Sequence, residues 1–183
     1  MPEKYDYLIR GGLTITQGEI HRWDVAVRGE KITKIEPNIV GAAEREIDAT
    51  GRYILPGIID VHAHPVYLDN LQGTSMTAAH GGITTIIHYA YAKPGERLLE
   101  VIERFREDGE KGSVIDFALH GGMFDPKQQT EEIPAAVQAG VTSFKMFMTY
   151  AKLGWMTDDY QLMRAMDIIS KVGGLAMVHA ENG

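Results

Sequence analysis

Two histidines, His62 and His64, follow an apolar run at 58–61. Residues two apart on a strand point to the same face, so both imidazoles can reach one cation. A turn-forming Pro-Gly pair at 56–57 precedes them and Pro65 follows, which holds the exit of the strand in a defined path. Two histidines at a strand end can also be structural, so the pair gains weight from the candidate ligands that follow later strands.

A second candidate is Lys145, which lies inside the apolar run 144–148. An unpaired ammonium is expensive to bury. An ion pair with an aspartate or glutamate would remove that cost, and so would a solvent-exposed strand end. Alternatively, burial lowers the pKa of the amine until it captures carbon dioxide and becomes an anionic carbamate, which can bridge two divalent ions.

The third candidate is His179, at the end of the apolar run 175–178. A lone histidine in such a place is more often structural than a ligand. Glu181 follows two residues later and could hydrogen-bond a metal ligand from outside, although a surface or capping role explains it equally well.

Composition limits the kind of site and the class of partner. The chain of 183 residues has no cysteine, so any metal must be held by nitrogen and oxygen ligands. Its net charge of -7 and pI near 5.5 come from acids spread along the chain, which argues against a nucleic-acid partner. No run approaches the roughly 18 apolar residues of a membrane span, and the N-terminus lacks an apolar signal core. We therefore expect a cytoplasmic protein with no membrane partner.

The pattern of elements changes near Pro56, and we place a domain boundary there. Short strands and glycine turns fill residues 1–55, which predicts a small β domain. Its expected strands are 7–10, 13–16, 24–28, 31–35, 46–49 and 53–55.

Residues 56–183 alternate apolar strands with amphipathic helices, the pattern of a parallel sheet with crossover helices. The expected strands are 58–62, 84–88, 114–119, 143–148 and 175–179, and the expected helices are 74–80, 96–107, 133–139 and 158–172. Neither GxGxxG nor GxxxxGK[ST] occurs, so an open nucleotide-binding sheet has no positive signal. Five histidines fall at or just past expected strand ends, where (β/α)8 barrels assemble their sites; these are His62, His64, His88, His120 and His179. The fold class predicted is α/β, with five units of a TIM-like barrel.

Four motifs resemble the amidohydrolase superfamily, and within it the hydantoinase/dihydropyrimidinase family. They are LPGIIDVHAH at 55–64, GGITT at 81–85, SFKMFMTY at 143–150 and VHAEN at 178–182. The resemblance implies that His62 and His64 bind one metal ion, that Lys145 as its carbamate bridges two ions, and that His179 binds the other. It further implies that Tyr150 donates to the developing oxyanion. Tyr150 could instead be a loop aromatic that packs on the barrel rim.

The same resemblance implies what this chain lacks. The family takes a histidine from a sixth strand and an aspartate from an eighth, and neither is present. We therefore expect the N-terminal part of a longer parent, with only half of a β-sandwich in residues 1–55, and an isolated segment that is poorly stable or inactive. His88 departs from the acidic residue expected in many relatives, and the loop 66–71 has no assignment. His120 is expected in the barrel interior, His80 on a helix and His21 in the β domain, none of them as metal ligands.

The function that the resemblance implies for the parent is hydrolysis of a cyclic amide with two divalent ions. Opening of a hydantoin or dihydropyrimidine ring is the preferred hypothesis. Zinc suits the expected ligands best, and manganese or cobalt can occupy such a site. Allantoin or dihydroorotate hydrolysis by a sister enzyme is the second reading. A non-catalytic dihydropyrimidinase-like scaffold is the third, and retention of the candidate ligands argues against it. Relatives are commonly tetramers, so a homotetramer is expected.

Overall fold

The computed structural model describes residues 3–65 and 69–181. The chain separates into two compact units, Met1–Pro56 (unit 1) and Gly57–Gly183 (unit 2). Residues 66–68 of the unassigned loop 66–71, and Asn182 of the last motif, lie outside the described residues. Within the described part of the chain, no helix is both long enough and apolar enough to cross a membrane.

Unit 1 consists of two small sheets, one of four strands in the order β5-β4-β1-β6 and one of three in the order β3-β2-β7. The strands are β1 (Lys4–Arg10), β2 (Leu13–Thr16), β3 (Glu19–His21), β4 (Asp24–Arg28), β5 (Lys31–Glu36), β6 (Ala42–Asp48) and β7 (Tyr53–Ile54). Strand β3 was not expected from the sequence. It pairs with β2 across the two-residue turn Gln17-Gly18, and both turn residues have positive φ, as this kind of hairpin requires. Buried Tyr5, Leu8, Ala26 and Ile39 form the core of this unit.

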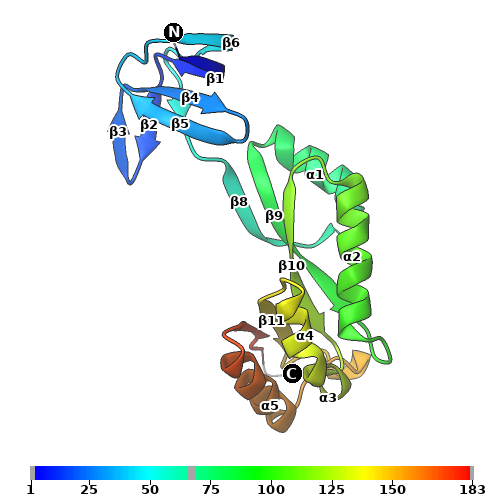
Figure 1. The fold of residues 1–183 in the computed structure, drawn as a ribbon. Coiled ribbons are helices and arrows are strands. Elements are labelled where there is room, and N and C mark those ends of the chain that lie inside the picture. Colours follow the sequence, from blue (N-terminus) through cyan, green and yellow to red (C-terminus); the bar gives the residue numbers. More distant parts are fainter. Residues whose placement is uncertain (1–2, 66–68, 182–183) are drawn as a thin grey trace. The chain divides into compact units, whose positions relative to one another are not determined.

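Unit 2 is built on one five-stranded parallel sheet in the order β12-β11-β10-β9-β8 (Figure 1). Its strands are β8 (Ile58–Ala63), β9 (Ile83–Ala92), β10 (Asp116–Met123), β11 (Ser143–Phe147) and β12 (Leu175–His179). Its helices are α1 (Leu71–His80), α2 (Leu98–Gly112), α3 (Pro126–Gln129), α4 (Ile133–Gln138) and α5 (Asp159–Lys171), with the 3-10 turns η2 (Thr130–Glu132) and η3 (Ala151–Leu153). The sheet curls as in a half-barrel, and each strand is followed by helix before the next. The α/β class predicted from the sequence is confirmed.

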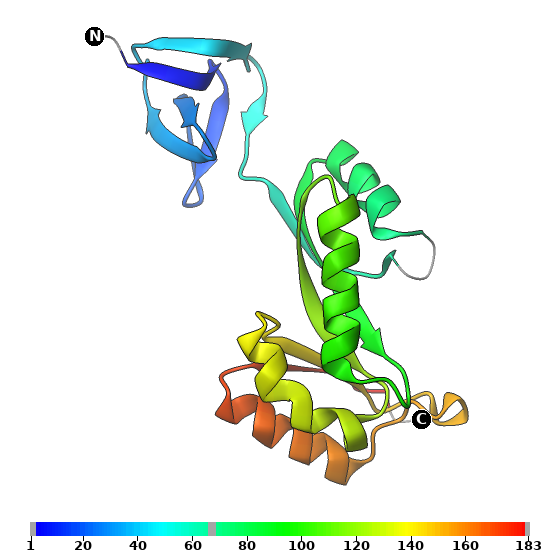
Figure 2. The same ribbon diagram turned by 45° about the vertical axis from the view of Figure 1, so that its right-hand side comes forward.

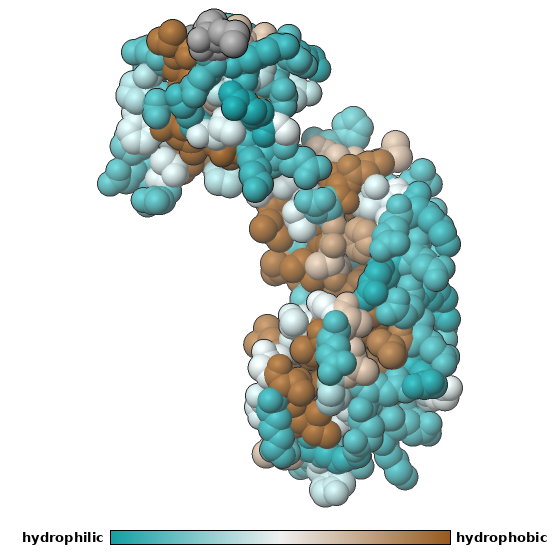
Figure 3. Space-filling model, in the orientation of Figure 1, coloured by the Kyte–Doolittle hydropathy of each residue, from teal (hydrophilic) through white to brown (hydrophobic). Residues whose placement is uncertain are grey.

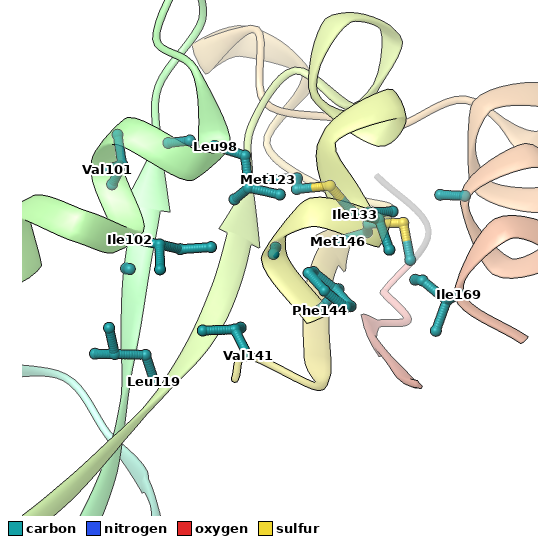
Figure 4. Close-up of a cluster of buried hydrophobic side chains, with 14 residues drawn as sticks. Leu98, Val101, Ile102, Leu119, Met123, Ile133, Val141, Phe144, Met146 and Ile169 are labelled. Carbon is teal, nitrogen blue, oxygen red and sulfur yellow. The ribbon is translucent and has the colours of Figure 1, made fainter. Parts of the chain in front are cut away.

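The helices of unit 2 pack on one face of this sheet, which we call the helix face. Figure 2 shows α2 lying along β9 and β10, with α4 and α5 side by side near β11. Alternate strand residues meet these helices, because successive side chains on a strand point to opposite faces. Figure 4 shows the resulting core, in which Leu98 and Ile102 of α2 lie close to Leu119 and Phe144 of the sheet. The intervening strand residues point to the opposite side of the sheet, which we call the open face.

Two strands of unit 2 run four residues past the ends that the sequence pattern indicated. Strand β9 was expected to end at His88 and continues to Ala92, and β10 was expected to end at Leu119 and continues to Met123. The two strands stay paired in parallel as far as Met123↔Ala92. The expectation that His88 and His120 lie at strand ends is therefore wrong, because backbone pairing continues past both residues. Helix α2 also begins later than expected, at Leu98, since Pro94 and Gly95 hold the chain in a turn before it.

The two outer strands of the sheet are β8 and β12. Large hydrophobic side chains on β8 are exposed, namely Ile58, Ile59 and Val61, and Leu175 on β12 is exposed as well. In Figure 3 hydrophobic surface gathers on the strand side of unit 2, whereas the solvent side of α2 is hydrophilic. The sheet is thus better covered at its centre than at its edges.

Candidate active site

A cavity of about 450 Å³ lies over the open face of the sheet, toward the carboxyl ends of its strands. It is lined by His62, His64, Tyr91, Phe124, Lys145, Phe147, Tyr150, Trp155 and His179. All five site residues expected from the sequence are in this set, although His62, Lys145 and His179 come from three strands and His64 and Tyr150 from the segments that follow β8 and β11. Because parallel strands end at the same edge of a sheet, residues far apart in sequence meet there.

His62 and His64 lie with their ring centroids 4.9 Å apart. The carboxylate of Asp60 accepts a hydrogen bond from the backbone N–H of His62 at 3.0 Å, which fixes the chain just before the pair. Nδ1 of His62 lies 3.0 Å from the hydroxyl of Tyr89, and Nδ1 of His64 lies 3.1 Å from the hydroxyl of Tyr91. Burial lowers the pKa of His64, and the nearby charges of His62 and Lys145 lower it further. A neutral imidazole, which is the form that binds metals, is therefore favoured at His64.

Lys145 is the middle residue of β11, and its half-buried side chain lies on the open face, whereas the side chains of its neighbours Phe144 and Met146 are buried on the helix face. Its amine lies 5.5 Å from the centre of the Phe147 ring. Among the described residues it forms neither an ion pair nor a hydrogen bond, so the sequence alternative of an ordinary ion pair finds no partner there. Burial lowers the pKa of the amine, which raises the share of the neutral, nucleophilic form.

His179 is the last residue of β12. Its Nε2 lies 3.0 Å from a carboxylate oxygen of Glu181, so Glu181 is positioned to orient this ring from outside. The ring stands 6.0 Å from that of Phe147 and 5.6 Å from that of Tyr150. The carbonyl of His179 also accepts a hydrogen bond from the N–H of Met148, which ties the ends of β11 and β12 together.

Tyr150 has a left-handed backbone, with φ of 65°. This conformation is strained for a residue other than glycine, and such strain concentrates at functional sites. The loop around it holds the conformation: the carbonyl of Tyr150 accepts hydrogen bonds from the N–H groups of Leu153 at 3.0 Å and Trp155 at 3.3 Å. The N–H of Thr157 in turn donates to the carbonyl of Phe147 at 2.7 Å. The strained backbone directs the phenol ring to the cavity, beside His179 and Trp155.

The remaining histidines lie outside the cavity. His120 is buried on the open face, with Nδ1 2.5 Å from the hydroxyl of Ser143 and Nε2 2.9 Å from the carbonyl of Val61. Burial lowers its pKa. His80 ends α1, and His21 stacks on Trp23 in unit 1.

His88 also lies outside the cavity, but on the helix face of the sheet. Its ring packs against Phe105 and Phe117. It is only 1% exposed, and neither ring nitrogen has a hydrogen-bond partner among the described residues. Burial, assisted by the charge of His120, lowers its pKa to about 4. The ring is therefore neutral at physiological pH.

Several residues that line or support the cavity were not identified from the sequence. They are Tyr89, Tyr91, Phe124, Phe147 and Trp155, which form one aromatic cluster. One signal was available: Tyr89 and Tyr91 are two residues apart on β9, the same spacing as the histidine pair on β8. The loop position of Trp155 gave no such signal, because it depends on the turn that follows Tyr150.

The donor set can be compared with what a metal ion requires. Within residues 3–65 and 69–181, no three histidine, aspartate or glutamate side chains are close enough to hold an ion together. The open face instead offers three imidazoles and a half-buried amine without an anionic partner. Imidazole nitrogens, together with the oxygens that a carbamate on Lys145 would supply, are ligands that suit zinc. The residues thus fit a metal site in which a modified lysine replaces the missing acidic ligand.

Comparison with known proteins gives several relatives. The chain is 39% identical to a D-hydantoinase of Ralstonia pickettii, and the match covers 97% of this chain and 40% of the relative. It is 32% identical to a dihydropyrimidinase of Rattus norvegicus, over 96% of this chain and 36% of that protein. It is also 33% identical to human dihydropyrimidinase-related protein 5, over 96% of this chain and 33% of that protein. No protein-family model matches the chain.

Solved structures agree with these sequence relatives. One D-hydantoinase structure superposes with a TM-score of 0.91 at 38% identity, over 97% of this chain and 40% of that one. A dihydropyrimidinase from Brevibacillus agri superposes with a TM-score of 0.90 at 34% identity, again over 97% and 40%. The chain thus spans 33–40% of the length of these relatives. By sequence and by fold, it is a homologue of the D-hydantoinases and dihydropyrimidinases.

Proposed function

We propose that the protein hydrolyses a cyclic amide, by opening the ring of a hydantoin or a dihydropyrimidine. The observation that carries the proposal is the position of Lys145, a half-buried amine with no anionic partner among the described residues, in a cavity shared with His62, His64 and His179. The names of the relatives support the same chemistry.

The ligands follow from this arrangement. In the proposal His62 and His64 would hold one divalent ion and His179 would hold a second, and Lys145, as its carbamate, would supply the anionic oxygen ligands. The carbamate forms when the neutral amine attacks carbon dioxide and loses a proton, which converts a costly buried cation into an anion. When bound, the two ions would lower the pKa of an attacking water and polarise the amide carbonyl. Zinc is the metal that we propose.

The chain's own residues complete the site. The hydroxyl of Tyr150 donates a hydrogen bond to the carbonyl oxygen as negative charge develops there. The rings of Tyr91, Phe124 and Trp155 stack face to face, with centroids 4.9 Å and 4.2 Å apart, and form an apolar column beside the cavity. In the proposal this column excludes water from one side of the cavity and offers apolar contact to a ring substrate.

The test is metal analysis of the purified protein at its full length, followed by turnover assays with hydantoin, dihydrouracil, allantoin and dihydroorotate. We expect bound divalent metal and ring opening of hydantoin or dihydrouracil. Turnover of allantoin or dihydroorotate alone would instead identify a sister cyclic amidohydrolase. Metal-free protein without turnover of any substrate would contradict the proposal and favour a non-catalytic scaffold.

A further inference from the structure

His62 at the end of β8 and His64 just past it each have their own tyrosine on β9. We propose that Tyr89 and Tyr91 are positioning residues, whose hydroxyls hold the rings of His62 and His64 through Nδ1, so that Nε2 of each ring would be the metal-binding nitrogen. This inference rests on the proposed function, because it concerns how the same site is prepared.

The strand register explains why the residues pair one to one. Tyr89 lies 27 residues after His62, and Tyr91 lies 27 residues after His64. Strands β8 and β9 are parallel neighbours, and Ala63 lies opposite His88, so His64 comes level with Tyr89 rather than with Tyr91. Each imidazole is therefore reached by the phenol of a tyrosine that lies further along β9 than the residue opposite it. Members of each pair lie two residues apart, so all four side chains point to the open face. One repeated geometry therefore produces two contacts, of 3.0 Å and 3.1 Å.

Packing holds the two phenols where these contacts need them. Tyr89 is 0% exposed and Tyr91 is 8% exposed. The two rings are parallel, with centroids 5.2 Å apart, and the ring of His64 is parallel to both, at 4.8 Å from Tyr89 and 6.0 Å from Tyr91. A buried phenol requires a hydrogen-bond partner. Each hydroxyl finds one on an imidazole.

Strand β10 makes room for this arrangement. Gly122 lies opposite Tyr91 in the register, and a Cβ atom on Gly122 would come within 2.2 Å of the Tyr91 ring. Any larger residue would have to displace that ring. The absence of a side chain at position 122 is thus a requirement of the Tyr91 position.

The contact has a direction that matters for chemistry. If Nδ1–H donates to the phenol oxygen, the proton is on Nδ1 and Nε2 keeps its lone pair for a cation. If the phenol donates to Nδ1, the proton is on Nε2, which then cannot bind a metal. The proposal requires the first arrangement, in which a hydrogen bond to one ring nitrogen fixes the tautomer for the other.

The experiment uses the full-length protein and the variants Tyr89→Phe and Tyr91→Phe, which keep the ring and delete only the hydroxyl. Each should weaken zinc binding about 10- to 100-fold in a chelator competition. Tyr160→Phe, on the exposed side of α5, is the matched control and should bind zinc like the wild type. Gly122→Ala should also weaken binding, because it displaces the Tyr91 ring while leaving the hydroxyl present.

A second readout follows the tautomer itself. Nitrogen-15 NMR of the metal-free protein should show the proton on Nδ1 at His62 and His64, and should show loss of that preference in the matching phenylalanine variant. Wild-type zinc affinity in both variants, or Nε2–H tautomers in the metal-free wild type, would overturn the inference and leave the proposed function standing. A wild type that binds no zinc would overturn both.

Discussion

The two faces of the sheet in unit 2 use histidine in opposite ways. On the open face, His62 and His64 each have a hydroxyl within hydrogen-bond distance, and both line a cavity. On the helix face, His88 is buried against aromatic rings with both nitrogens unpartnered among the described residues. Parallel sheets are normally apolar on both faces because both are covered. The face with partnered polar groups is therefore the one that carries the proposed site, whereas a buried polar group without a partner lowers stability.

Phe144 and Lys145 show the same contrast within one strand. Phe144 is 0% exposed in the helix-face core, and the next residue, Lys145, lines the cavity on the open face. Replacing Phe144 should therefore lower the stability of the fold, whereas replacing Lys145 should impair the proposed metal site.

Lys145→Met should abolish both metal binding and turnover in the full-length protein, because methionine fills the space but cannot form a carbamate. The measurements are metal content and hydantoin turnover. Lys127→Met, at an exposed lysine on α3, is the control and should keep both. A Lys145→Met protein that retained its metal would show that the lysine is not a ligand.

Phe144→Ala should lower the free energy of unfolding by about 3–5 kcal/mol, because it leaves a cavity in the helix-face core. Urea denaturation measures this change. Molecules that remain folded should keep the metal stoichiometry of the wild type. Loss of metal from folded Phe144→Ala protein would mean that the two faces are not separable.

Tyr150→Phe should lower kcat about 10²- to 10³-fold, because it removes one donor to the developing oxyanion. The metal content and the free energy of unfolding should hardly change, since the ring and the backbone conformation are kept. Steady-state kinetics and metal analysis test this together. An unchanged kcat would support the alternative that Tyr150 only packs on the rim.

His88→Leu should reduce the sensitivity of the fold to acid. The pKa of His88 is lowered from 6.5 to about 4, so its contribution to stability is fully present above pH 6.5 and is lost as the pH falls toward 4. The loss amounts to roughly 3 kcal/mol over that window. The free energy of unfolding of the variant should therefore fall less between pH 6.5 and 4. His64 and His120, whose pKa values are also lowered, should keep part of the acid sensitivity.

Much of the fold followed from alternation and turn chemistry. The expected strands at 13–16, 24–28 and 175–179 match β2, β4 and β12 to the residue, because glycine turns or polar residues border them. Alternation also brings the predicted site residues to one face, since His62, Lys145 and His179 each neighbour an apolar residue of the opposite face. Their shared cavity agrees with the sequence argument, and their roles as ligands stay predictions.

The rest depended on contacts between strands. His88 was expected at a strand end, and only the pairing of β9 with β10 shows that it lies in the middle of one. The partnership of Tyr91 with His64 requires the register of two strands and a glycine on a third. Such information is absent from any single segment, so sequence patterns identified the candidate donors better than the residues that orient them.

The left-handed backbone at Tyr150 lowers the stability of the fold, while the phenol that it holds is needed for the proposed reaction. Holding a tyrosine in this conformation costs on the order of 1–3 kcal/mol, and a glycine would adopt it without strain. A directed-evolution experiment that selected only for heat resistance should therefore enrich glycine or asparagine at position 150. The resulting proteins would survive higher temperatures and fail as catalysts, so any such screen needs an activity assay at every round.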